Sequence, residues 1–345
     1  MKRSTVKSGV SQYEMGETVS RNAYIVGVGH CVPDGVITNA DLEKIVDTSD
    51  EWIVTRTGIR ERRKVGEGEA SSDLVVKAVE NALEMAGMEA GDVQGIIVGT
   101  VTPDYPFPST AALVADRIGM GKIPAYDFEA GCSAFIYGLI QAKAFVESGI
   151  MDRIVVAGVD CLTKITNWTD RSSCILFGDG AGAVVISSRG PGGRLGGWHW
   201  GADGSLGEHL IQPAGGSRHP ASHETVDENL HTIRMDGSRI FKHAVRAMRD
   251  SCMKALEIDG TEKKDVDLLI SHQANLRIID ATARALELKP EQVYINIQKY
   301  GNTSAASIPI ALDEALREGI IKESSTVVVA AFGAGLTWGG MILHW

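Results

Sequence analysis

Two stretches of this chain repeat one another, and the repeat limits the folds open to it. The first, GCSAFIYGLIQAKAFVESGI, begins at Gly131, and the second, GNTSAASIPIALDEALREGI, begins at Gly301. Each opens with glycine and small residues, continues as an apolar helical pattern and ends in Gly-Ile, 170 residues apart. Downstream, IVVA at 154–157 matches VVVA at 327–330. The repeat predicts two similar halves that pack against one another.

Apolar strand patterns alternate with helical patterns in both halves. Nearly unbroken apolar runs, such as GIIVGTV at 95–101, are typical of strands covered on both faces. SDLVVKAVENALEMAG at 72–87 has its apolar residues at helical spacing. The two repeated helices are apolar nearly all round and should be central, with Pro309 kinking the second or delaying its start. This alternation predicts an α/β protein with a largely parallel sheet.

We divide the chain into three parts. Residues 1–20 are expected to be a poorly ordered extension, residues 21–190 the first half and residues 191–345 the second half. The first half carries the candidate nucleophile described below, and the second half carries the residues expected to assist it. A polar stretch at 191–228 has no assigned role.

The composition excludes several classes of protein. A formal net charge of -10 lacks the basic surplus of nucleic-acid-binding proteins. The five cysteines are odd in number and lack metal-ligand spacing, so we expect reduced thiols and a cytoplasmic protein. The sequence has no run of about 18 apolar residues that would predict a transmembrane helix. Its first 20 residues lack the apolar segment of a secretory signal.

Cys132 is the leading candidate nucleophile. It lies in EAGCSAF, between the strand-like AYDF and a buried helix expected at about 133–148. The free N–H groups and the dipole of a helix N-terminus stabilise a thiolate, which is the reactive form of cysteine. The alternative interpretation is a small residue that fills a tight turn, and position alone does not separate the two.

Two residues of the second half are candidates to assist Cys132. His272 directly follows the apolar strand LLIS, a place that suits a site better than a core. Asn302 follows Gly301, and the repeat aligns it with Cys132 or the next residue. It is either a helix N-cap or an amide donor in a buried site. A polar, glycine-rich stretch holds other histidines, expected to be solvated and without metal-ligand spacing: His199, His219, His223 and His231.

The glycine-rich segments are better explained as strand turns than as nucleotide loops. VGVGHCVPDG at 26–35 fails the dinucleotide pattern at Val32 and Pro33, and no helical pattern follows it. FGDGAG at 177–182 and FGAGLTWGG at 332–340 lack the lysine of a phosphate loop. Their backbone N–H groups can nevertheless face a site and serve an oxyanion hole.

One charged segment, DEWIVTRTGIRERRK at 50–64, combines Trp52 with a group of cations. A solvated charged face accounts for most of these cations. An aromatic ring beside arginines also fits a nucleotide and its phosphates. The cations are Arg56, Arg60, Arg62, Arg63 and Lys64.

Six motifs occur in order: DEWIVTRTGIRER, EAGCSAF, FGDGAGA, HQANLRI, GNTSAAS and FGAGLTWGG. Together they resemble the β-ketoacyl-acyl carrier protein synthase III family of thiolase-fold condensing enzymes, from about Ala23 to Trp345. The resemblance implies a thiolase-like fold, in which two βαβαβαββ-type halves form a five-layered αβαβα core, and it implies a homodimer. It also implies that Cys132, His272 and Asn302 form a catalytic triad.

The same resemblance implies the reaction. An acyl-CoA loads Cys132, malonyl-acyl carrier protein loses CO2, and the resulting carbanion attacks the thioester to give 3-oxoacyl-carrier protein, which initiates type II fatty acid synthesis. Backbone N–H groups of Cys132 and Ala334, where the family often has glycine, would hold the oxyanion. His272 and Asn302 would donate hydrogen bonds to the enolate, so the ring nitrogen facing it must carry hydrogen. No metal or cofactor is implied.

The binding residues follow from the same match. Trp52 would stack on the adenine of CoA, with Arg56 and Arg171 nearby, and Phe107 would limit the acyl pocket at the dimer interface. The acidic carrier protein would dock near Lys242, Gln273, Arg277 and Arg284. The sequence does not decide between acetyl, branched and longer primers. A starter enzyme of a polyketide or other secondary-metabolite pathway is the alternative hypothesis.

Overall fold

The computed structural model describes residues 21–345, and the predicted extension at 1–20 lies outside the described residues. Most strands belong to one large sheet: β1 (Tyr24–Cys31), β4 (Ile96–Gly99), β5 (Ala125–Phe128), β6 (Arg153–Cys161), β7 (Asp179–Ser187), β8 (Gly193–Ala202), β11 (Leu268–Ser271), β12 (Thr326–Gly333) and β13 (Thr337–His344). Two small hairpins add β2 (Gly35–Thr38) with β3 (Glu61–Lys64), and β9 (Leu210–Ile211) with β10 (Arg234–Met235).

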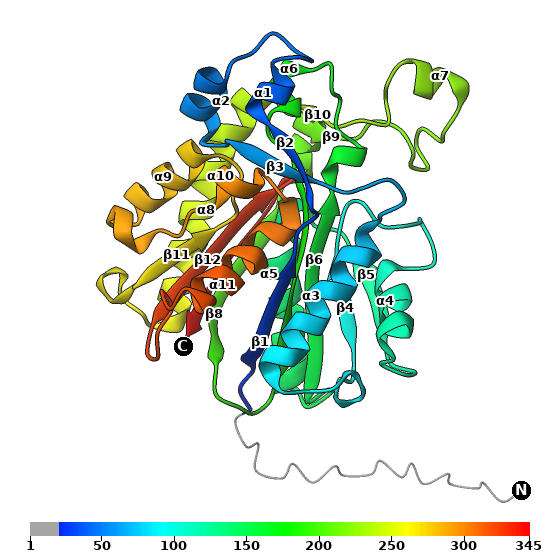
Figure 1. The fold of residues 1–345 in the computed structure, drawn as a ribbon. Helices are drawn as coiled ribbons and strands as arrows, with labels where there is room; N and C mark the ends of the chain where they lie inside the picture. The colour runs from blue at the N-terminus through cyan, green and yellow to red at the C-terminus, as the bar shows by residue number, and fades with distance from the viewer. Residues whose placement is uncertain (1–20) are drawn as a thin grey trace, which may run out of the picture.

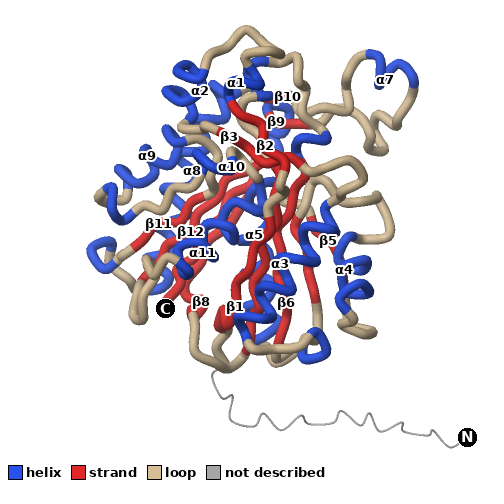
Figure 2. Tube along the Cα trace, in the orientation of Figure 1, coloured by secondary structure: helices blue, strands red, loops and turns tan. Residues whose placement is uncertain are grey.

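The helices alternate with these strands along the chain (Figures 1 and 2). They are α1 (Asn39–Leu42), α2 (Asp50–Thr57), α3 (Ser71–Ala86), α4 (Thr110–Ile118), α5 (Ala134–Glu147), α6 (Arg171–Cys174), α7 (His223–Asp227), α8 (Gly237–Asp259), α9 (Leu276–Ala285), α10 (Ile297–Tyr300) and α11 (Ser307–Arg317). Short 3₁₀ turns are η1 (Ala90–Asp92), η2 (Gly131–Ser133), η3 (Leu162–Lys164), η4 (Gly204–His209), η5 (Lys263–Asp265), η6 (Pro290–Gln292) and η7 (Ser304–Ala306).

The strand order shows the predicted repeat, but the prediction of a largely parallel sheet was wrong, because the strands at the centre of the sheet pair antiparallel. The large sheet runs β11-β12-β13-β8-β1-β7-β6-β4-β5. In one part β4 is parallel to β6, β7 is antiparallel to β6, and β1 is antiparallel to β7. In the other part β11, β12, β13 and β8 repeat these relations in the same order. The two parts join only where Tyr24 and Ile25 pair with Arg194 and Gly193.

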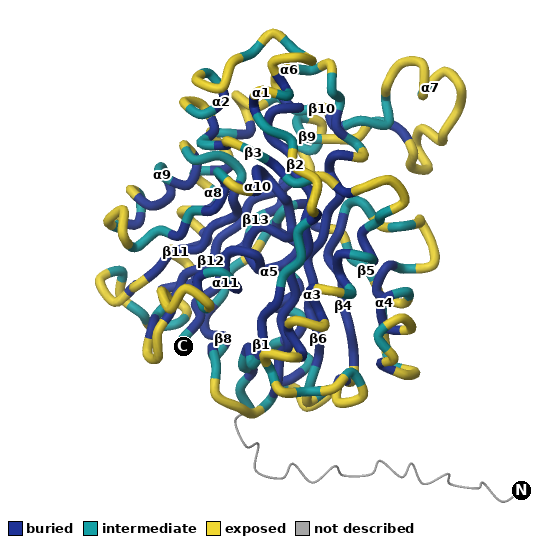
Figure 3. Tube along the Cα trace, viewed as in Figure 1, coloured by how far each residue is buried: buried dark blue, intermediate teal, exposed yellow. Residues whose placement is uncertain are grey.

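Three apolar clusters show how the layers stack. One lies between α3, α4 and the first part of the sheet, and another lies between α8, α9 and the second part. The largest lies between the two parts and includes Phe135 and Leu139 of α5 and Ile308 and Leu312 of α11. The order is therefore helix, sheet, central helices, sheet, helix, which confirms the five-layered prediction. Figure 3 shows that these strands are buried along most of their length.

The central helices differ slightly from the sequence alignment. Both are buried nearly all round, and Gly149-Ile150 and Gly319-Ile320 follow their ends as predicted. Their beginnings are 173 residues apart, from Ala134 to Ser307, so the second helix begins three residues later than the alignment placed it. Pro309 lies in the first turn of α11, where its missing N–H costs no intrahelical hydrogen bond.

The VGVG segment is part of strand β1, and its glycines let helix α3 pack closely against the strand. A Cβ on Gly27 would lie 2.1 Å from the carbonyl oxygen of Ala82, and one on Gly29 would lie 2.4 Å from its nitrogen. No side chain fits between the strand and the helix at these positions. The segment therefore has a packing role, in agreement with the rejection of a dinucleotide loop.

The stretch without an assigned role contains β8, η4, β9 and α7. The segment between β9 and β10 projects from the body of the molecule and is largely exposed (Figures 1 and 3). Of its histidines, His219 and His223 are exposed as predicted. The prediction was wrong for His199, which is half-buried in β8 with Nδ1 3.4 Å from Ser251 Oγ. His231 is also half-buried, 3.0 Å from Thr225 Oγ1.

Candidate active site

The site forms at the carboxyl ends of the parallel strands, where the chain leaves the sheet. Cys132 follows β5, His272 follows β11, and Ala334 follows β12. Loops at this edge of an open α/β sheet carry side chains from several strands into one place. The two sheet parts face one another across α5 and α11, so residues 140 positions apart in sequence meet there.

Cys132 lies in η2, two residues before the first residue of α5, and is half-buried. Burial raises the pKa of its thiol to about 12, and the Ser304 hydroxyl, which donates to its sulfur at 3.3 Å, acts in the opposite direction. Its place before a helix agrees with the prediction. Burial is the largest influence on the pKa of this thiol in the free protein.

His272 is 2% exposed, and burial lowers its pKa to about 3, so the ring is neutral at physiological pH. Its Nδ1 lies 2.7 Å from Ser307 Oγ. That hydroxyl also lies 2.8 Å from the carbonyl oxygen of Ser304 and 3.4 Å from the backbone nitrogen of Gln273, which donates to it. The hydroxyl has one hydrogen to donate. When it goes to Nδ1, the ring hydrogen is on Nε2, which is the arrangement that a donor role requires; when it goes to Ser304, the ring hydrogen is on Nδ1.

Asn302 lies just before η7 and has a local role as well as a free amide group. Its Oδ1 accepts a hydrogen bond from the backbone nitrogen of Ser304 at 2.9 Å. This contact fixes the orientation of the amide and leaves the Nδ2 hydrogens without a partner among residues 21–345. The N-cap of η7 is Thr303, so the N-cap prediction for Asn302 was wrong, and its amide is left as a donor. The residue of η7 that corresponds to Cys132 in η2 is Ala305, so the alignment with Asn302 was not structural.

Two cavities meet at Cys132. We call the first the α8–α9 cavity; it has a volume of about 120 Å³ and is lined by Cys132, His272, Asn302, Phe241 and Ile278, among others. The second, the β9–β10 cavity, has about 480 Å³ and is mostly apolar. Its lining residues include Cys132, Val101, Leu162, Ile165, Leu210, Ile233, Ser304 and Ala334. The sulfur thus separates a space that holds the histidine and the amide from an apolar space.

The backbone nitrogens of Cys132 and Ala334 lie side by side because two glycines let the η2 and β12–β13 turns touch. A Cβ on Gly333 would lie 2.4 Å from the nitrogen of Cys132, and one on Gly131 would lie 2.6 Å from that of Ala334. Within residues 21–345 no carbonyl accepts a hydrogen bond from either nitrogen. Two free N–H groups beside the sulfur are the arrangement of an oxyanion hole.

Sequence reasoning missed three residues that touch this group. Ser304 and Ser307 are in the GNTSAAS motif, three residues apart at the start of a helix, and that spacing was the available signal. Asp160 is a charged residue near the end of the otherwise apolar strand β6, and it is fully buried. A lone acid in a buried strand was the signal for it.

Trp52, Arg56 and Arg171 come together, as the resemblance implied. Trp52 and Arg56 are on α2, and Arg171 begins α6. The guanidinium carbons of Arg56 and Arg171 lie 4.7 and 4.8 Å from the centre of the Trp52 ring, and the indole is half-buried. The backbone oxygen of Asp47 accepts a hydrogen bond from Arg171 at 2.8 Å. An aromatic ring and two arginines on one surface can bind an adenine ring and phosphates.

Arg62, which we expected to be solvated, is buried without an acidic partner. Its guanidinium donates to the carbonyl oxygens of Ile37 and Ile175 and to Asn39 Oδ1, at 3.2, 2.7 and 2.9 Å. Burial lowers its pKa to about 10. It lies in β3, where alternate residues face opposite sides, and it joins this hairpin to the segment after α6. It is therefore a structural residue.

Of the residues implied at a carrier-protein entrance, three are on the surface and one is not. Lys242 on α8 and Arg277 and Arg284 on α9 are exposed, and none forms an ion pair within the described residues. Gln273 is 1% exposed, and its amide bonds to the backbone of Ser271, Tyr294 and Asn296. The prediction for Gln273 was wrong, because a residue at a strand end can point into the core.

Phe107 lies in the loop between β4 and α4 and is 86% exposed. It lines neither the α8–α9 cavity nor the β9–β10 cavity of its own chain. The single chain therefore does not place Phe107 in an acyl pocket.

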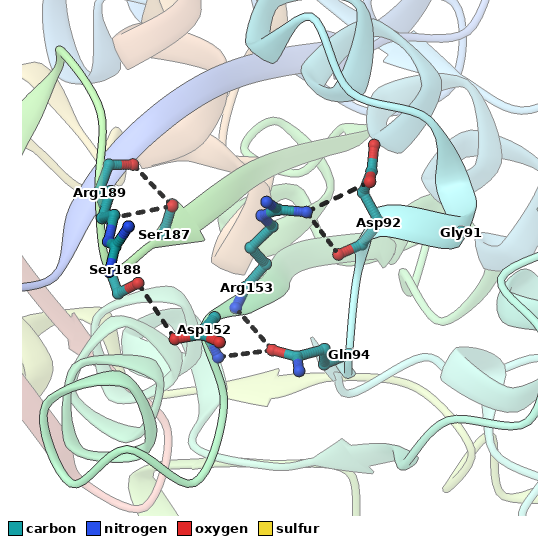
Figure 4. A pocket seen from close by; sticks show the side chains of 8 residues that line it. All are labelled: Gly91, Asp92, Gln94, Asp152, Arg153, Ser187, Ser188 and Arg189. Carbon is teal, nitrogen blue, oxygen red and sulfur yellow. Dashed lines mark hydrogen bonds and ion pairs between the residues drawn. The ribbon is translucent and has the colours of Figure 1, made fainter.

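A separate polar hollow of about 470 Å³ lies at the opposite end of the sheet, beside the start of β6 and the end of β7 (Figure 4). Among its charged groups Arg153 pairs with Asp92 at 3.2 Å, and Asp152 pairs with Arg21 outside the lining. The backbone nitrogen of Arg153 donates to Gln94 at 3.1 Å. It has no cysteine or histidine among its lining residues. We do not connect it with the chemistry at Cys132.

Two features are absent from residues 21–345. None of their helices combines the length and the apolar composition needed to cross a membrane. No three histidine, cysteine or acidic side chains among them gather closely enough to hold a metal ion.

Comparisons with known proteins agree with this geometry. Residues 126–204 match the family described as 3-oxoacyl-[acyl-carrier-protein (ACP)] synthase III, and residues 256–345 match its C-terminal family. The β-ketoacyl-[acyl-carrier-protein] synthase III of Caldanaerobacter subterraneus subsp. tengcongensis is 52% identical over 94% of this chain and 98% of its own length.

Solved structures show the same likeness. The synthase III of Aquifex aeolicus superposes with a TM-score of 0.86 at 44% identity, covering 94% of this chain and all of that one, 100%. The priming β-ketosynthase of the R1128 polyketide pathway superposes with a TM-score of 0.87 at 32% identity, covering 94% and 96%. These likenesses confirm the thiolase-like fold expected from the motifs. The chain belongs to the β-ketoacyl-[acyl-carrier-protein] synthase III family.

Proposed function

We propose that this chain joins an acyl-CoA primer to malonyl-acyl carrier protein through an acyl-Cys132 intermediate, and that the residues described above have the following roles. Cys132 Sγ attacks the thioester carbonyl of acyl-CoA. The oxyanion that forms is held by the N–H groups of Cys132 and Ala334. Collapse of the tetrahedral intermediate breaks the carbon–sulfur bond to CoA, which leaves with the thiol proton as free CoA. The enzyme retains the acyl group as a thioester.

The second half-reaction uses the α8–α9 cavity. The malonyl group loses CO2, and the electron pair of the broken bond becomes an enolate on its thioester. Asn302 Nδ2 and His272 Nε2 donate hydrogen bonds to the oxygen of this enolate. The enolate carbon attacks the acyl-Cys132 carbonyl, and Cys132 leaves as a thiolate that takes up a proton. The products are 3-oxoacyl-carrier protein and CO2.

The two cavities suit the two parts of the substrates. The β9–β10 cavity is apolar and adjoins the sulfur, so we assign the acyl chain to it. The α8–α9 cavity holds the histidine and the amide, so we assign the thioester arms of CoA and of the carrier protein to it. Trp52, Arg56 and Arg171 bind the nucleotide of CoA. The chemistry uses donors of the protein itself, and we propose no metal or cofactor for it.

The partners follow from the surface. Lys242, Arg277 and Arg284 are free cations near the α8–α9 cavity, and they can attract an acidic carrier protein to a chain of net charge -10. We also propose a homodimer in which Phe107 is covered by the second copy and limits its acyl cavity. The support is the exposure of Phe107 and of Tyr105, 57%, on the same loop. Free cysteines at all five positions fit a cytoplasmic location.

A polyketide-type priming role is the second candidate, because a polyketide priming synthase shares the fold at 32% identity. The higher identity of 52% to a synthase III favours the fatty acid reaction. Condensation rates with a panel of short and branched acyl-CoA primers and with carrier proteins from both kinds of pathway separate the two.

The single observation that carries the proposal is the meeting of Cys132, His272 and Asn302 in one cavity beside two free backbone N–H groups. The test is labelling of purified protein with radioactive acetyl-CoA and other short acyl-CoAs, followed by malonyl-carrier protein. We expect the wild type to be labelled and Cys132→Ala to lose the label. Cys252→Ala, which changes a buried cysteine between α8 and the second part of the sheet, should keep it. Label that persists in Cys132→Ala contradicts the proposal.

A further inference from the structure

Asp160 is a buried acid that the proposed mechanism does not use. It is 0% exposed, near the carboxyl end of β6. Its Oδ1 accepts three hydrogen bonds, from Thr100 Oγ1 at 3.0 Å, from the nitrogen of Val101 at 2.8 Å and from Thr102 Oγ1 at 3.0 Å. Its Oδ2 is buried and has no hydrogen-bond partner within the described residues. An unpaired oxygen of this kind requires an explanation.

The distribution of donors indicates where a proton would sit. All three donors are on Oδ1, so Oδ2 is the oxygen free to carry hydrogen and to donate it. Burial raises the pKa of Asp160 to about 6, and the Ser304 hydroxyl is the first of the groups that act against this shift. The turn that holds Ser304 packs against β6, where a Cβ on Gly158 would lie 2.3 Å from the carbonyl oxygen of Ala305, and the Ser304 hydroxyl does not satisfy Oδ2 in this structure.

Ser304 links Asp160 to the nucleophile. The same hydroxyl donates to Cys132 Sγ at 3.3 Å. The backbone of Ser304 has a φ of 50°, a left-handed conformation that residues other than glycine rarely adopt. Its N–H donates to Asn302 Oδ1, and its carbonyl oxygen lies 2.8 Å from Ser307 Oγ. These two backbone contacts hold Ser304 in its strained conformation, which keeps the hydroxyl between Asp160 and Cys132.

We propose, on the basis of the proposed function of Cys132, that Asp160 is a positioning residue whose protonated form directs the Ser304 hydroxyl onto the Cys132 sulfur. The hydroxyl has one hydrogen to donate. When Asp160 is protonated, Oδ2–H donates to Ser304 Oγ, and Ser304 donates to the sulfur, where it stabilises a thiolate. When Asp160 is ionised, its carboxylate competes for that hydrogen, and its negative charge disfavours a thiolate at Cys132.

Other titratable groups act on this cluster and have to be separated from Asp160. Glu129, from the loop before η2, raises the pKa of Cys132. Cys161 follows Asp160 in β6, and Asp179 of β7 and Lys164 of η3 both act on Cys161. Asp179 is the matched control, because it is also a fully buried carboxyl but accepts its hydrogen bonds from Thr163 and Val65, away from Ser304.

The test is the rate of alkylation of Cys132 by iodoacetamide in the full-length protein, measured by mass spectrometry from about pH 5 to pH 9. This readout follows the thiolate and does not require acyl transfer. Asp160→Asn keeps an oxygen for the three donors and adds an amide that always donates to Ser304. We expect it to alkylate about ten-fold faster than wild type above pH 6, since a hydrogen bond to a charged group has about that effect. Asp179→Asn should show the same dependence of the alkylation rate on pH as wild type.

Two variants of Ser304 test the link. Ser304→Ala removes the hydroxyl, and Ser304→Gly removes it while suiting the positive φ, so agreement between them separates the hydroxyl from the backbone. Both should alkylate more slowly than wild type, and adding Asp160→Asn to either should accelerate alkylation less than it does when the hydroxyl is present, because only the effect of the charge remains. An Asp160→Asn profile equal to that of wild type overturns the proposal. An acceleration of the same size with and without the Ser304 hydroxyl also overturns it.

Acyl loading from acetyl-CoA, measured in parallel, separates this proposal from the function it rests on. Loading that persists in Cys132→Ala defeats the proposed function. Normal loading of wild type on Cys132, with alkylation that ignores residues 160 and 304, defeats only the role of Asp160.

Discussion

Ser307 Oγ lies 2.7 Å from Nδ1 of His272 and 2.8 Å from the carbonyl oxygen of Ser304, and the proposed mechanism requires its single hydrogen to go to Nδ1. The ring is neutral because burial lowers its pKa to about 3, so it has one hydrogen to place. A hydroxyl that donates to Nδ1 places that hydrogen on Nε2, toward the α8–α9 cavity. A histidine in this state can donate to an enolate without first taking a proton.

Ser307→Ala should therefore impair condensation more than loading. Without the hydroxyl, both ring tautomers and several ring orientations become accessible, and the donor is present only part of the time. We expect kcat for condensation to fall by about ten-fold, with the rate of Cys132 acylation nearly unchanged. Single-turnover loading from acyl-CoA and steady-state condensation with malonyl-carrier protein measure the two steps. Equal losses in both steps would indicate a general structural defect instead.

Asn302→Asp should be more damaging than Asn302→Ala in the decarboxylation step. The aspartate keeps an oxygen for the backbone N–H of Ser304, so the local turn is preserved. It replaces the Nδ2 donor with a negative charge that faces the developing enolate. We expect condensation to fall by at least about a hundred-fold while Cys132 still loads. Release of CO2 from labelled malonyl-carrier protein is the measurement, and an Asn302→Asp variant as active as the wild type would remove Asn302 from the mechanism.

Arg171→Ala should weaken the binding of CoA substrates and nothing else. Arg171 is exposed beside Trp52, so its loss removes a contact to the nucleotide without opening the core. We expect KM for acyl-CoA to rise by roughly ten-fold at constant kcat. The same variant should use an acyl-pantetheine, which lacks the nucleotide, as well as wild type does. Lys322→Ala, exposed and far along the chain, is the control and should leave both KM values unchanged.

The sequence predicted the layers of this fold because the apolar patterns that set them are long. Two helices apolar on all sides can only be central, and strands without polar interruptions need cover on both faces. The same patterns placed helix ends less well: α11 begins three residues later than predicted, because η7 precedes it and the Ser304 N–H bonds to the Asn302 side chain. Local hydrogen bonds, which determine such ends, leave little trace in apolar periodicity.

The candidate site was predictable where a residue type is unusual for its place. His272 follows the buried strand β11, Cys132 lies just before the buried helix α5, and both line the α8–α9 cavity. Ser304 and Ser307 could not be separated from ordinary turn serines, because a small hydroxyl suits solvent and core equally. Gln273 was assigned to the carrier-protein entrance by the family match, whereas three backbone groups bind its amide in the core.

Arg62→Met should lower stability far more than its polar type suggests. The methionine keeps much of the volume but leaves the carbonyl oxygens of Ile37 and Ile175 buried without a donor. We expect the free energy of unfolding to fall by about 2–4 kcal/mol. Arg60→Met, at an exposed position of the same segment, should change it by less than about 0.5 kcal/mol. Urea unfolding of both variants measures the difference, and equal small effects would mean that Arg62 is not needed to hold the hairpin.

His272 should make the protein less stable as the pH falls below 6.5. Its pKa is 6.5 in the unfolded chain and about 3 in the folded one, so between these values only the unfolded state takes the proton. The stabilising contribution is complete above pH 6.5 and is lost progressively toward pH 3. Asp160 acts in the opposite direction, because its folded pKa of about 6 lies above its ordinary value of 3.8.

A comparison of wild type with His272→Asn isolates the histidine from Asp160, which both proteins retain. The asparagine can still donate to Ser307, but it does not titrate. Urea unfolding at several pH values between about 4.5 and 7 should show that the free energy of unfolding falls less steeply with falling pH in the variant. The difference between the two slopes should be at most that due to the binding of one proton. Parallel curves for the two proteins would mean that the folded state lets His272 take a proton as readily as the unfolded chain does, and the neutral donor would lose its physical basis.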